Sequence, residues 1–215
     1  MSEIPRQEQG ERQERLVEEL RQRLGDEHRD TLAAILDLAD IAWAQGRIVT
    51  ARRLEEEVFA GRRKLLGDEH PDTLKARGKL AVTLAAQGEL GAARRMQEEI
   101  AAALARLLGE EHRDTLRAIN NLAGTVAAEG DLETAHRLLQ STLATQTRLW
   151  GENDPDSLAT MGNLAALLWR AGELDEAHAA QSQVVEIRRR LSGDDDVATQ
   201  AAVAALAAIE RDAGF

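Results

Sequence analysis

Acidic residues next to histidine are the first feature of this sequence that could do chemistry. Carboxylates and imidazoles together serve as metal ligands or as general acids and bases. Three copies of such a cluster and a fourth that lacks histidine occur in the chain: Asp26-Glu27-His28, Asp68-Glu69-His70, Glu110-Glu111-His112 and Glu152-Asn153-Asp154. The copies are 42 residues apart, so they would stand far from one another along a repetitive fold. We therefore expect helix-boundary residues here, with no metal site and no catalytic residue.

Other signatures of catalysis are also missing from the sequence. No nucleophile–base pairing, phosphate-binding loop or dinucleotide-binding glycine pattern is present. We expect a protein that is not an enzyme and that needs no cofactor.

Composition limits the remaining classes. Hydrophobic residues make up 43% of the 215 residues but aromatic residues only 2%, which favours a helical core of Leu, Ala, Val and Ile. The net charge of −11 argues against nucleic acid as a partner, because a phosphate backbone requires clustered Lys and Arg. The chain has no cysteine, no apolar signal sequence and no run of about 18 apolar residues that could span a membrane. These features predict a cytoplasmic protein that does not contact the membrane.

The elements that carry these residues repeat with a fixed period. The segment Gly25–Leu32 recurs at Gly67–Leu74 and Gly109–Leu116, and a second ladder of glycines has the same 42-residue spacing. Two segments of helical length and helical apolar periodicity lie in each period. We predict an antiparallel helix pair in each repeat, with neighbouring pairs stacked because one pair cannot bury its own apolar face.

Glycine and proline mark the predicted helix boundaries. Gly67 and Gly151 directly follow the last apolar residue of a helix, where a left-handed conformation favours glycine. Pro71 and Pro155 stand where the next helix begins. The sequence thus predicts nine to ten helices and no sheet.

This pattern resembles the 42-residue tetratricopeptide repeats (TPRs) of kinesin light chains. The matching motifs are the Leu-Gly-Asp-Glu-His-Pro-Asp-Thr-Leu linker around Pro71, the Asn-Asn-Leu-Ala of residues 120–123 and the Gln-Gly-Glu-Leu turn of residues 87–90. The resemblance covers roughly residues 8–214. It implies an all-α, right-handed superhelical solenoid whose first helices line a concave groove, and in this family such grooves take peptides.

Within the groove, the resemblance implies two columns of binding residues on the first helices. One column precedes each Leu-Ala pair and contains Lys79, Asn121 and Asn163, and the other lies four residues earlier and contains Lys75 and Arg117. In the family these columns supply cations and asparagines that hold peptide carboxylates and amides. The full predicted set also includes residues beside the columns and at the groove's far edge: Lys75, Lys79, Arg117, Asn120, Asn121, Asn163, Trp169 and Arg170.

Several residues depart from the family pattern. Asp37 and Asp40 make the first-repeat end of the groove acidic, and Gly78 and Gly162 replace the counterparts of Asn120. These glycines either leave room for a ligand or only weaken their helices, by about 1 kcal/mol each relative to alanine. For the tryptophans, the sequence leaves two roles open at Trp43 and Trp169, aromatic anchor or packing against the adjacent helix, and it favours a core position for Trp150.

The predicted organisation begins and ends on half repeats. Its parts are a flexible N-terminus (1–7), a capping helix (8–24), four repeats (25–66, 67–108, 109–150 and 151–192) and a half repeat of one helix (193–215). The last helix keeps the apolar residues Val197, Val203, Leu206 and Ile209, which something should cover. A homo-oligomer formed through this C-terminal helix is therefore a possible assembly.

The predicted function is that of a protein–protein interaction module that binds an acidic or C-terminal peptide segment in its concave groove. Two alternatives remain open. One is a structural protein that self-associates through its unpaired terminal helices, and the other is a regulator that senses a peptide or a small molecule.

Overall fold

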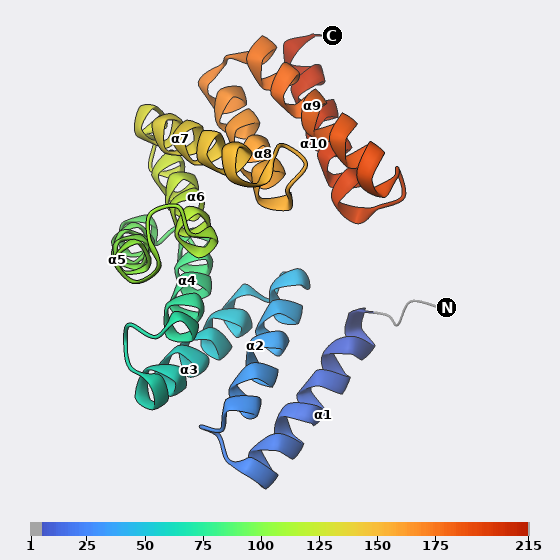
Figure 1. The fold of residues 1–215 in the computed structure, drawn as a ribbon. Coiled ribbons are helices and arrows are strands. Elements are labelled where there is room, and N and C mark those ends of the chain that lie inside the picture. Colours follow the sequence, from blue (N-terminus) through green and yellow to red (C-terminus); the bar gives the residue numbers. More distant parts are fainter. Residues whose placement is uncertain (1–5, 215) are drawn as a thin grey trace. The chain divides into compact units, whose positions relative to one another are not determined.

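The computed structural model describes residues 6–214 and consists of ten α-helices, without a strand among the described residues (Figure 1). The helices are α1 (Arg6–Leu24), α2 (Arg29–Ala44), α3 (Ile48–Leu66), α4 (Pro71–Ala86), α5 (Leu90–Leu108), α6 (Arg113–Ala128), α7 (Leu132–Trp150), α8 (Pro155–Ala171), α9 (Leu174–Ser192) and α10 (Val197–Ala213). Residues 1–5 of the predicted flexible segment and Phe215 lie outside the described residues. The all-α prediction is confirmed.

The helix boundaries follow the repeat period. The first helices begin at residues 29, 71, 113, 155 and 197, and the second helices after α1 begin at residues 48, 90, 132 and 174. Each set of starts is 42 residues apart. Helix α1 begins at Arg6, two residues before the expected start at residue 8.

The glycines that end the helices have two conformations, and the sequence anticipated only one. All ten ladder glycines have positive φ angles. Gly172 is left-handed, with φ 83° and ψ 8°. Gly67 and Gly151, for which we expected the same conformation, instead have ψ 168° with φ 89° and 85°. This extended, positive-φ region is essentially restricted to glycine, because glycine has no Cβ atom.

The histidines of the acidic clusters cap helices. His28, His70 and His112 are the N-cap residues of α2, α4 and α6, and the Nδ1 atom of each accepts a hydrogen bond from the backbone N–H two residues later. The donor–acceptor distances are 3.2, 3.1 and 3.2 Å. The interpretation of these clusters as helix boundaries agrees with this geometry, although the sequence did not identify the imidazole as the cap.

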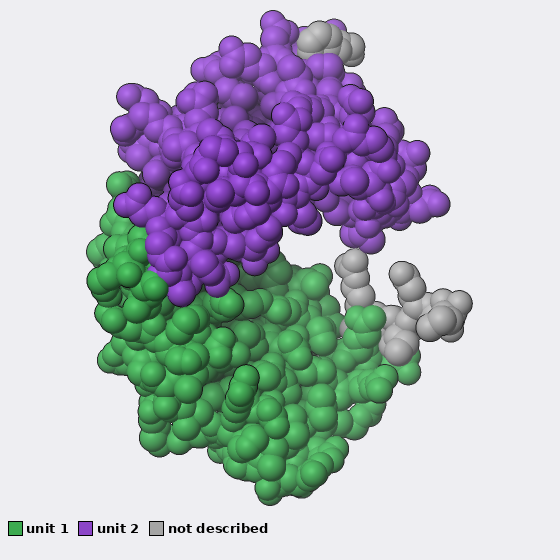
Figure 2. Space-filling model, in the orientation of Figure 1, with its two compact units in different colours: residues 1–107 green, residues 108–215 purple. Residues whose placement is uncertain are grey.

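The helices form two compact units, residues 1–107 and 108–215 (Figure 2). In the first unit, α1, α2 and α3 share a core that contains Val17, Ile35 and Val58. A second cluster joins α4 to α5 through Leu84 and Ala93. The second-helix stripe thus packs on the first helices, as the amphipathic pattern predicted.

The core of the second unit includes several clusters of described residues. Val126, Leu139 and Leu167 join α6, α7 and α8. Met161 and Val184 continue this core toward α10, and Ile209 of α10 packs against a separate cluster with Leu168 and Ala177.

The apolar stripe of α10 is covered more fully than we expected. Ile209 is 1% exposed, and Val203 and Leu206 are partly buried against the Met161 cluster. Only Val197 stands out, with 75% of its surface exposed. The exposed apolar surface of α10 therefore consists of Val197 and four alanines, which are Ala198, Ala201, Ala204 and Ala205.

No helix among the described residues is long and apolar enough to cross a membrane.

Candidate functional site

The eight predicted groove residues are divided between the two units. Lys75 and Lys79 lie on α4 in the first unit. The other six lie on α6 and α8 in the second unit: Arg117, Asn120, Asn121, Asn163, Trp169 and Arg170. Each group is described within its own unit.

In the first unit, one of the two cations predicted for ligand binding forms an ion pair within the unit. The Lys79 ammonium forms an ion pair with Asp40 of α2. Asp40 is one of the two acidic residues that differ from the family pattern, and Lys79 neutralises its charge within the unit. Lys75 is exposed on the same helix as Lys79.

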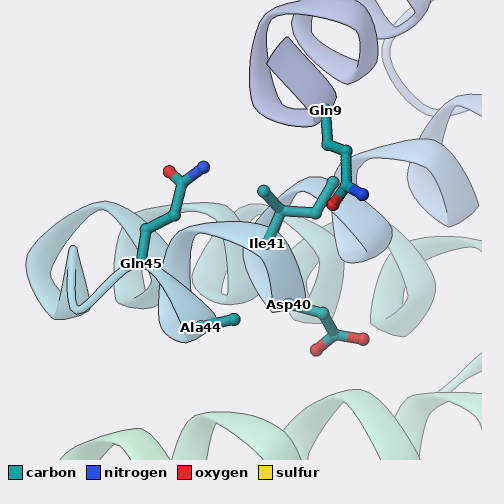
Figure 3. Close-up of a pocket in the computed structure, with 5 residues that line it drawn as sticks. All are labelled: Gln9, Asp40, Ile41, Ala44 and Gln45. Atoms are coloured by element: carbon teal, nitrogen blue, oxygen red, sulfur yellow. The ribbon is translucent and has the colours of Figure 1, made fainter. Parts of the chain in front are cut away.

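Beside this ion pair lies a small pocket of about 230 Å³ between α1 and α2 (Figure 3). It is lined by Gln9, Asp40, Ile41, Ala44 and Gln45. Its polar groups are two amides and one carboxylate, and Lys79 already holds that carboxylate. The pocket offers no cation for an acidic ligand.

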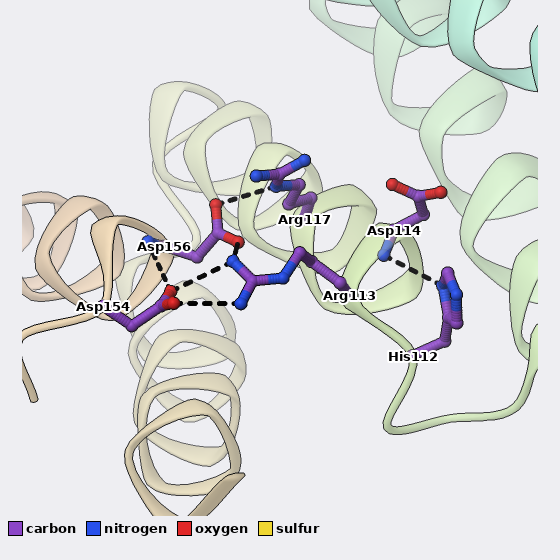
Figure 4. Close-up of polar contacts among 6 residues, drawn as sticks. All are labelled: His112, Arg113, Asp114, Arg117, Asp154 and Asp156. Carbon is purple, nitrogen blue, oxygen red and sulfur yellow. Dashed lines mark hydrogen bonds and ion pairs between the residues drawn. The ribbon is translucent and has the colours of Figure 1, made fainter. Parts of the chain in front are cut away.

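The second unit contains a network of charges between the starts of α6 and α8 (Figure 4). The guanidinium of Arg113 contacts both oxygens of Asp154 (2.9 and 3.2 Å) and also Asp156. Arg117 donates from Nε to Asp156 Oδ1 at 2.7 Å. The two carboxylates are only 13% and 12% exposed, so water weakens these contacts less than it would on an open surface.

An aromatic ring completes the network. The Arg113 guanidinium lies 4.1 Å from the centre of the Trp150 ring, at the end of α7, which is a cation–π distance. The Arg113 guanidinium lowers the pKa of the Asp154 carboxyl, and the same hydrogen bonds raise the pKa of Arg113. Trp150 is half-buried, so the tryptophan that we expected in the core lies at the edge of it.

Asp154 also caps a helix. Its Oδ1 accepts from the Asp156 backbone N–H at 2.9 Å, at the N-cap position of α8. His112 holds the corresponding position at α6. An imidazole that accepts through Nδ1 is neutral, whereas the Asp154 carboxylate can cap α8 and bind Arg113 together.

The predicted asparagines form a polar ladder on α6 and α8. Asn163 Nδ2 donates to Asn120 Oδ1 at 3.2 Å. Asn121 and Asn163 are exposed. A Cβ atom built on Gly162, next to Asn163, would meet nothing within 4 Å. This face thus offers amide groups beside open space.

Trp169 and Arg170 bind to neighbouring helices of the same unit. Trp169 packs against the Ile209 cluster and donates from Nε1 to Asp212 at 2.9 Å. Arg170 Nη2 donates to the Ala127 carbonyl, 3.0 Å away in the last turn of α6. Of the two roles that the sequence left open for Trp169, packing against the adjacent helix is the one seen in the structure. Trp43 is likewise half-buried.

A column of buried and half-buried glutamines escaped the sequence analysis. Gln13 Nε2 donates to the Ala34 carbonyl at 3.0 Å, and Gln181 Nε2 donates to the Ala202 carbonyl at 2.8 Å. These two pairs occupy equivalent places in the repeat. Glu55 stands 42 residues after Gln13, at the position of a glutamine.

Glu55 is only 3% exposed, and its Oε2 atom has no hydrogen-bond partner among the described residues. Burial raises the pKa of this carboxyl; the Thr83 hydroxyl and the Lys79 ammonium act in the opposite direction, and Asp40 adds to the rise. The 42-residue register could have revealed the substitution, since the carboxylate stands where an amide donor is needed.

The acidic–histidine clusters do not converge. Within the described part of the chain, no group of three or more His, Asp or Glu side chains is placed to hold a metal ion.

Comparisons with known proteins agree with the helical repeats. Family models described as tetratricopeptide repeat match residues 31–72, 72–148 and 114–190. No curated protein matches the sequence.

Solved structures with the same fold include proteins described as kinesin light chains. Two crystal structures of a P. anserina protein so described, with nearly identical TPR-like repeats, are 31% and 30% identical to this chain. They cover 86% and 87% of this chain and 88% and 89% of theirs, with TM-scores of 0.67 and 0.65. BtubC (BKLC) of P. vanneervenii, 24% identical, covers 99% of this chain and 85% of its own, with a TM-score of 0.72, and supports the fold alone. The predicted TPR solenoid of the kinesin-light-chain type is thus confirmed.

Proposed function

Because the chain belongs to the tetratricopeptide repeat family, we propose that its second unit binds an acidic or C-terminal peptide segment of a partner protein. Tetratricopeptide repeats are generally non-enzymatic scaffolds, and the family supports protein binding as the general function. The proposal assigns the contacts to the exposed faces of α6 and α8.

The observation that carries the proposal is the asparagine ladder beside Gly162. An extended peptide has backbone N–H and C=O groups at regular intervals, and primary amides can both donate to and accept from them. Asn121 and Asn163 are exposed on adjacent first helices. Gly162 has open space where a Cβ would lie, so a ligand backbone can approach α8 closely.

Arg117 supplies the charge for an acidic ligand. Its side chain is 53% exposed and contacts Asp156 only through Nε. The two terminal guanidinium nitrogens make no hydrogen bond with the described residues and are free to bind a carboxylate. Asp156 keeps Arg113 as a second partner, so Arg117 can turn toward a ligand without leaving a buried carboxylate unpaired.

Lys79 is left out of this assignment. Asp40 neutralises its ammonium, and a ligand carboxylate would have to displace Asp40. Trp169 and Arg170 are left out for the same reason, because their donors already bind Asp212 and Ala127.

A fluorescent Glu-Asp-Glu-Leu-Asp peptide with a free C-terminus tests the proposal by fluorescence anisotropy. Arg117→Gln should weaken binding about tenfold, since a charge-assisted hydrogen bond is worth about 1.5–3 kcal/mol and an exposed one lies at the lower limit. Asn121→Ala should weaken binding about fivefold, because a neutral hydrogen bond is worth about 1 kcal/mol. Only the Arg117 effect should shrink with added salt.

Arg190→Gln is the control, because Arg190 is an exposed cation on α9 that bonds to Asn153. It should bind the peptide like the wild type. Wild-type affinity in both Arg117→Gln and Asn121→Ala would remove the proposed site from α6 and α8.

Exposed Val197 favours self-association as a second candidate function. Val197→Glu changes the exposed large hydrophobic residue of α10, at a helix start that tolerates acidic residues. If α10 mediates assembly, this variant should have a lower mass in sedimentation equilibrium than the wild type. A monomeric wild type at high concentration would contradict assembly.

A further inference from the structure

A surface trough of about 850 Å³ lies on the exposed side of α7 in the second unit. Leu143 and Ala144 of α7 and Leu164 of α8 form its apolar floor, and Arg137 and Arg148 belong to its lining. Leu143 and Leu164 are partly buried against the core. The floor is therefore held in place by the fold.

The second helices differ in the charge that they carry at this place. In α3 and α5, the pairs Glu56-Glu57 and Glu98-Glu99 are exposed or half-exposed, and all four carboxylates bind arginines. The equivalent pair in α7, 42 residues after Glu98-Glu99, is Gln140-Ser141. The only acidic residue of α7 is Glu133, in its first turn.

The trough thus combines a cation, neutral polar groups and apolar surface. Arg137 hydrogen-bonds to the Thr134 hydroxyl at 3.2 Å and forms no ion pair with the described residues. Arg148 pairs with Glu111. A ligand carboxylate can therefore bind Arg137 without displacing a carboxylate of this chain.

We propose that this trough is a second protein-docking surface, which takes a short acidic–aliphatic segment of a partner protein. Arg137 binds a carboxylate of that segment, and an aliphatic side chain of the segment lies on Leu143 and Leu164. Arg137 and Arg148 are 11 residues apart on one helix, a rise of about 16 Å, which is the length of about five extended residues. This surface goes beyond the proposed function, because it uses α7 and none of the α6 and α8 residues assigned above.

Charge complementarity chooses this occupant. The chain has a net charge of −11, but the residues that line the trough include two arginines and no carboxylate. An acidic segment finds a guanidinium without a resident carboxylate in this trough, and guanidinium–carboxylate pairs are geometrically specific.

The test uses the fluorescent peptide acetyl-Asp-Leu-Asp-Asp-Leu-amide, which has no free C-terminus, and the full chain. Arg137→Gln should weaken its binding about tenfold. Ala144→Glu, which places a carboxylate on the trough floor, should abolish it. Binding of the same peptide with leucines replaced by glycines should also be about tenfold weaker, because the apolar floor is then unused.

Two matched controls lie on α5, 42 residues earlier. Arg95→Gln and Ala102→Glu change exposed residues beside the acidic pair Glu98-Glu99. Both should leave binding of the peptide unchanged. Equal effects of the α5 and α7 variants, or no binding of the peptide by the wild type at millimolar concentration, would overturn the proposal.

Sedimentation equilibrium distinguishes a second copy of the chain as the occupant. If the mass rises with concentration and Ala144→Glu abolishes this rise, the trough binds a second copy of the chain and not a peptide segment of another protein. Asn121→Ala should bind this peptide like the wild type, so failure at the trough and failure at α6 and α8 are separate results.

Discussion

Replacing Glu55 by glutamine should stabilise the protein above acidic pH. Glu55 is 3% exposed and lacks a partner at Oε2. In the equivalent places, Gln13 and Gln181 donate to backbone carbonyls at 3.0 and 2.8 Å. By the 42-residue register, a glutamine at residue 55 would donate to the carbonyl of Ala76. The ionised carboxylate has no proton to donate.

The expected gain is about 1–2 kcal/mol at pH 8. One added hydrogen bond contributes about 1 kcal/mol net, and the buried charge disappears, which offsets the loss of the attraction to Lys79. For a chain of this size, each kcal/mol corresponds to about 2–4 °C in melting temperature. We therefore expect Glu55→Gln to melt about 2–8 °C higher than the wild type.

The stabilisation by Glu55→Gln should depend on pH. Burial raises the pKa of Glu55 in the folded state above its unfolded value of about 4.3. Stability linked to this group is fully present below about pH 4.3 and is lost as the pH rises through the folded pKa. The advantage of Glu55→Gln should therefore vanish near pH 4, where the protonated acid can donate as the amide does.

Circular dichroism melting curves between pH 4 and pH 8 measure this difference. The matched reverse change is Gln181→Glu, which should lower the melting temperature at pH 8 and approach the wild type at pH 4. A Glu55→Gln variant that is less stable at pH 8, or whose advantage is the same at both pH values, would refute the reasoning.

Three further predictions concern local contacts. Asp154→Asn keeps the N-cap but loses the charge that faces Arg113, so this variant should melt a few degrees lower than the wild type at pH 7. Because the pKa of Asp154 is lowered in the folded state, the difference in melting temperature should fade as the pH falls below about 4 through that pKa. Gly61→Ala should destabilise, because its Cβ would lie 2.7 Å from Leu32, whereas Gly78→Ala meets nothing within 4 Å and should stabilise by about 1 kcal/mol in urea denaturation. A chelator should leave the melting temperature unchanged, because the N-cap histidines already accept backbone hydrogen bonds through Nδ1; a fall of several degrees would reveal a bound metal.

Much of the fold could be predicted because repeats multiply each local signal. Pro71 and Pro155 both begin helices, and the ladder glycines all end them or lie just beyond their ends. The ψ angle of Gly67 could not be predicted in the same way, since a glycine is equally compatible with the left-handed and the extended positive-φ regions. The chain path into the next helix decides between them.

The candidate site was predicted less well, because residue type does not reveal partners. Lys79 and Arg117 are cations on first helices, but the contacts of Lys79 with Asp40 and of Arg117 with Asp156 connect residues 39 positions apart. Trp150 and Asp154 replace the Leu and His of the first three copies, and Arg113 binds both. These paired departures from the repeat were the available signal for the charge network.

The thin packing of α10 has a consequence for motion. Three residues of α10 are buried, compared with seven of α8. Helices with few buried contacts open locally at a lower free energy than the rest of a domain. The amide protons of α10 should therefore exchange with solvent earlier than those of α8, while the ion pairs between α6 and α8 stay formed. Within the second unit, α6 and α8 should therefore open rarely and α10 often, and a protease should cut this unit first within residues 197–213.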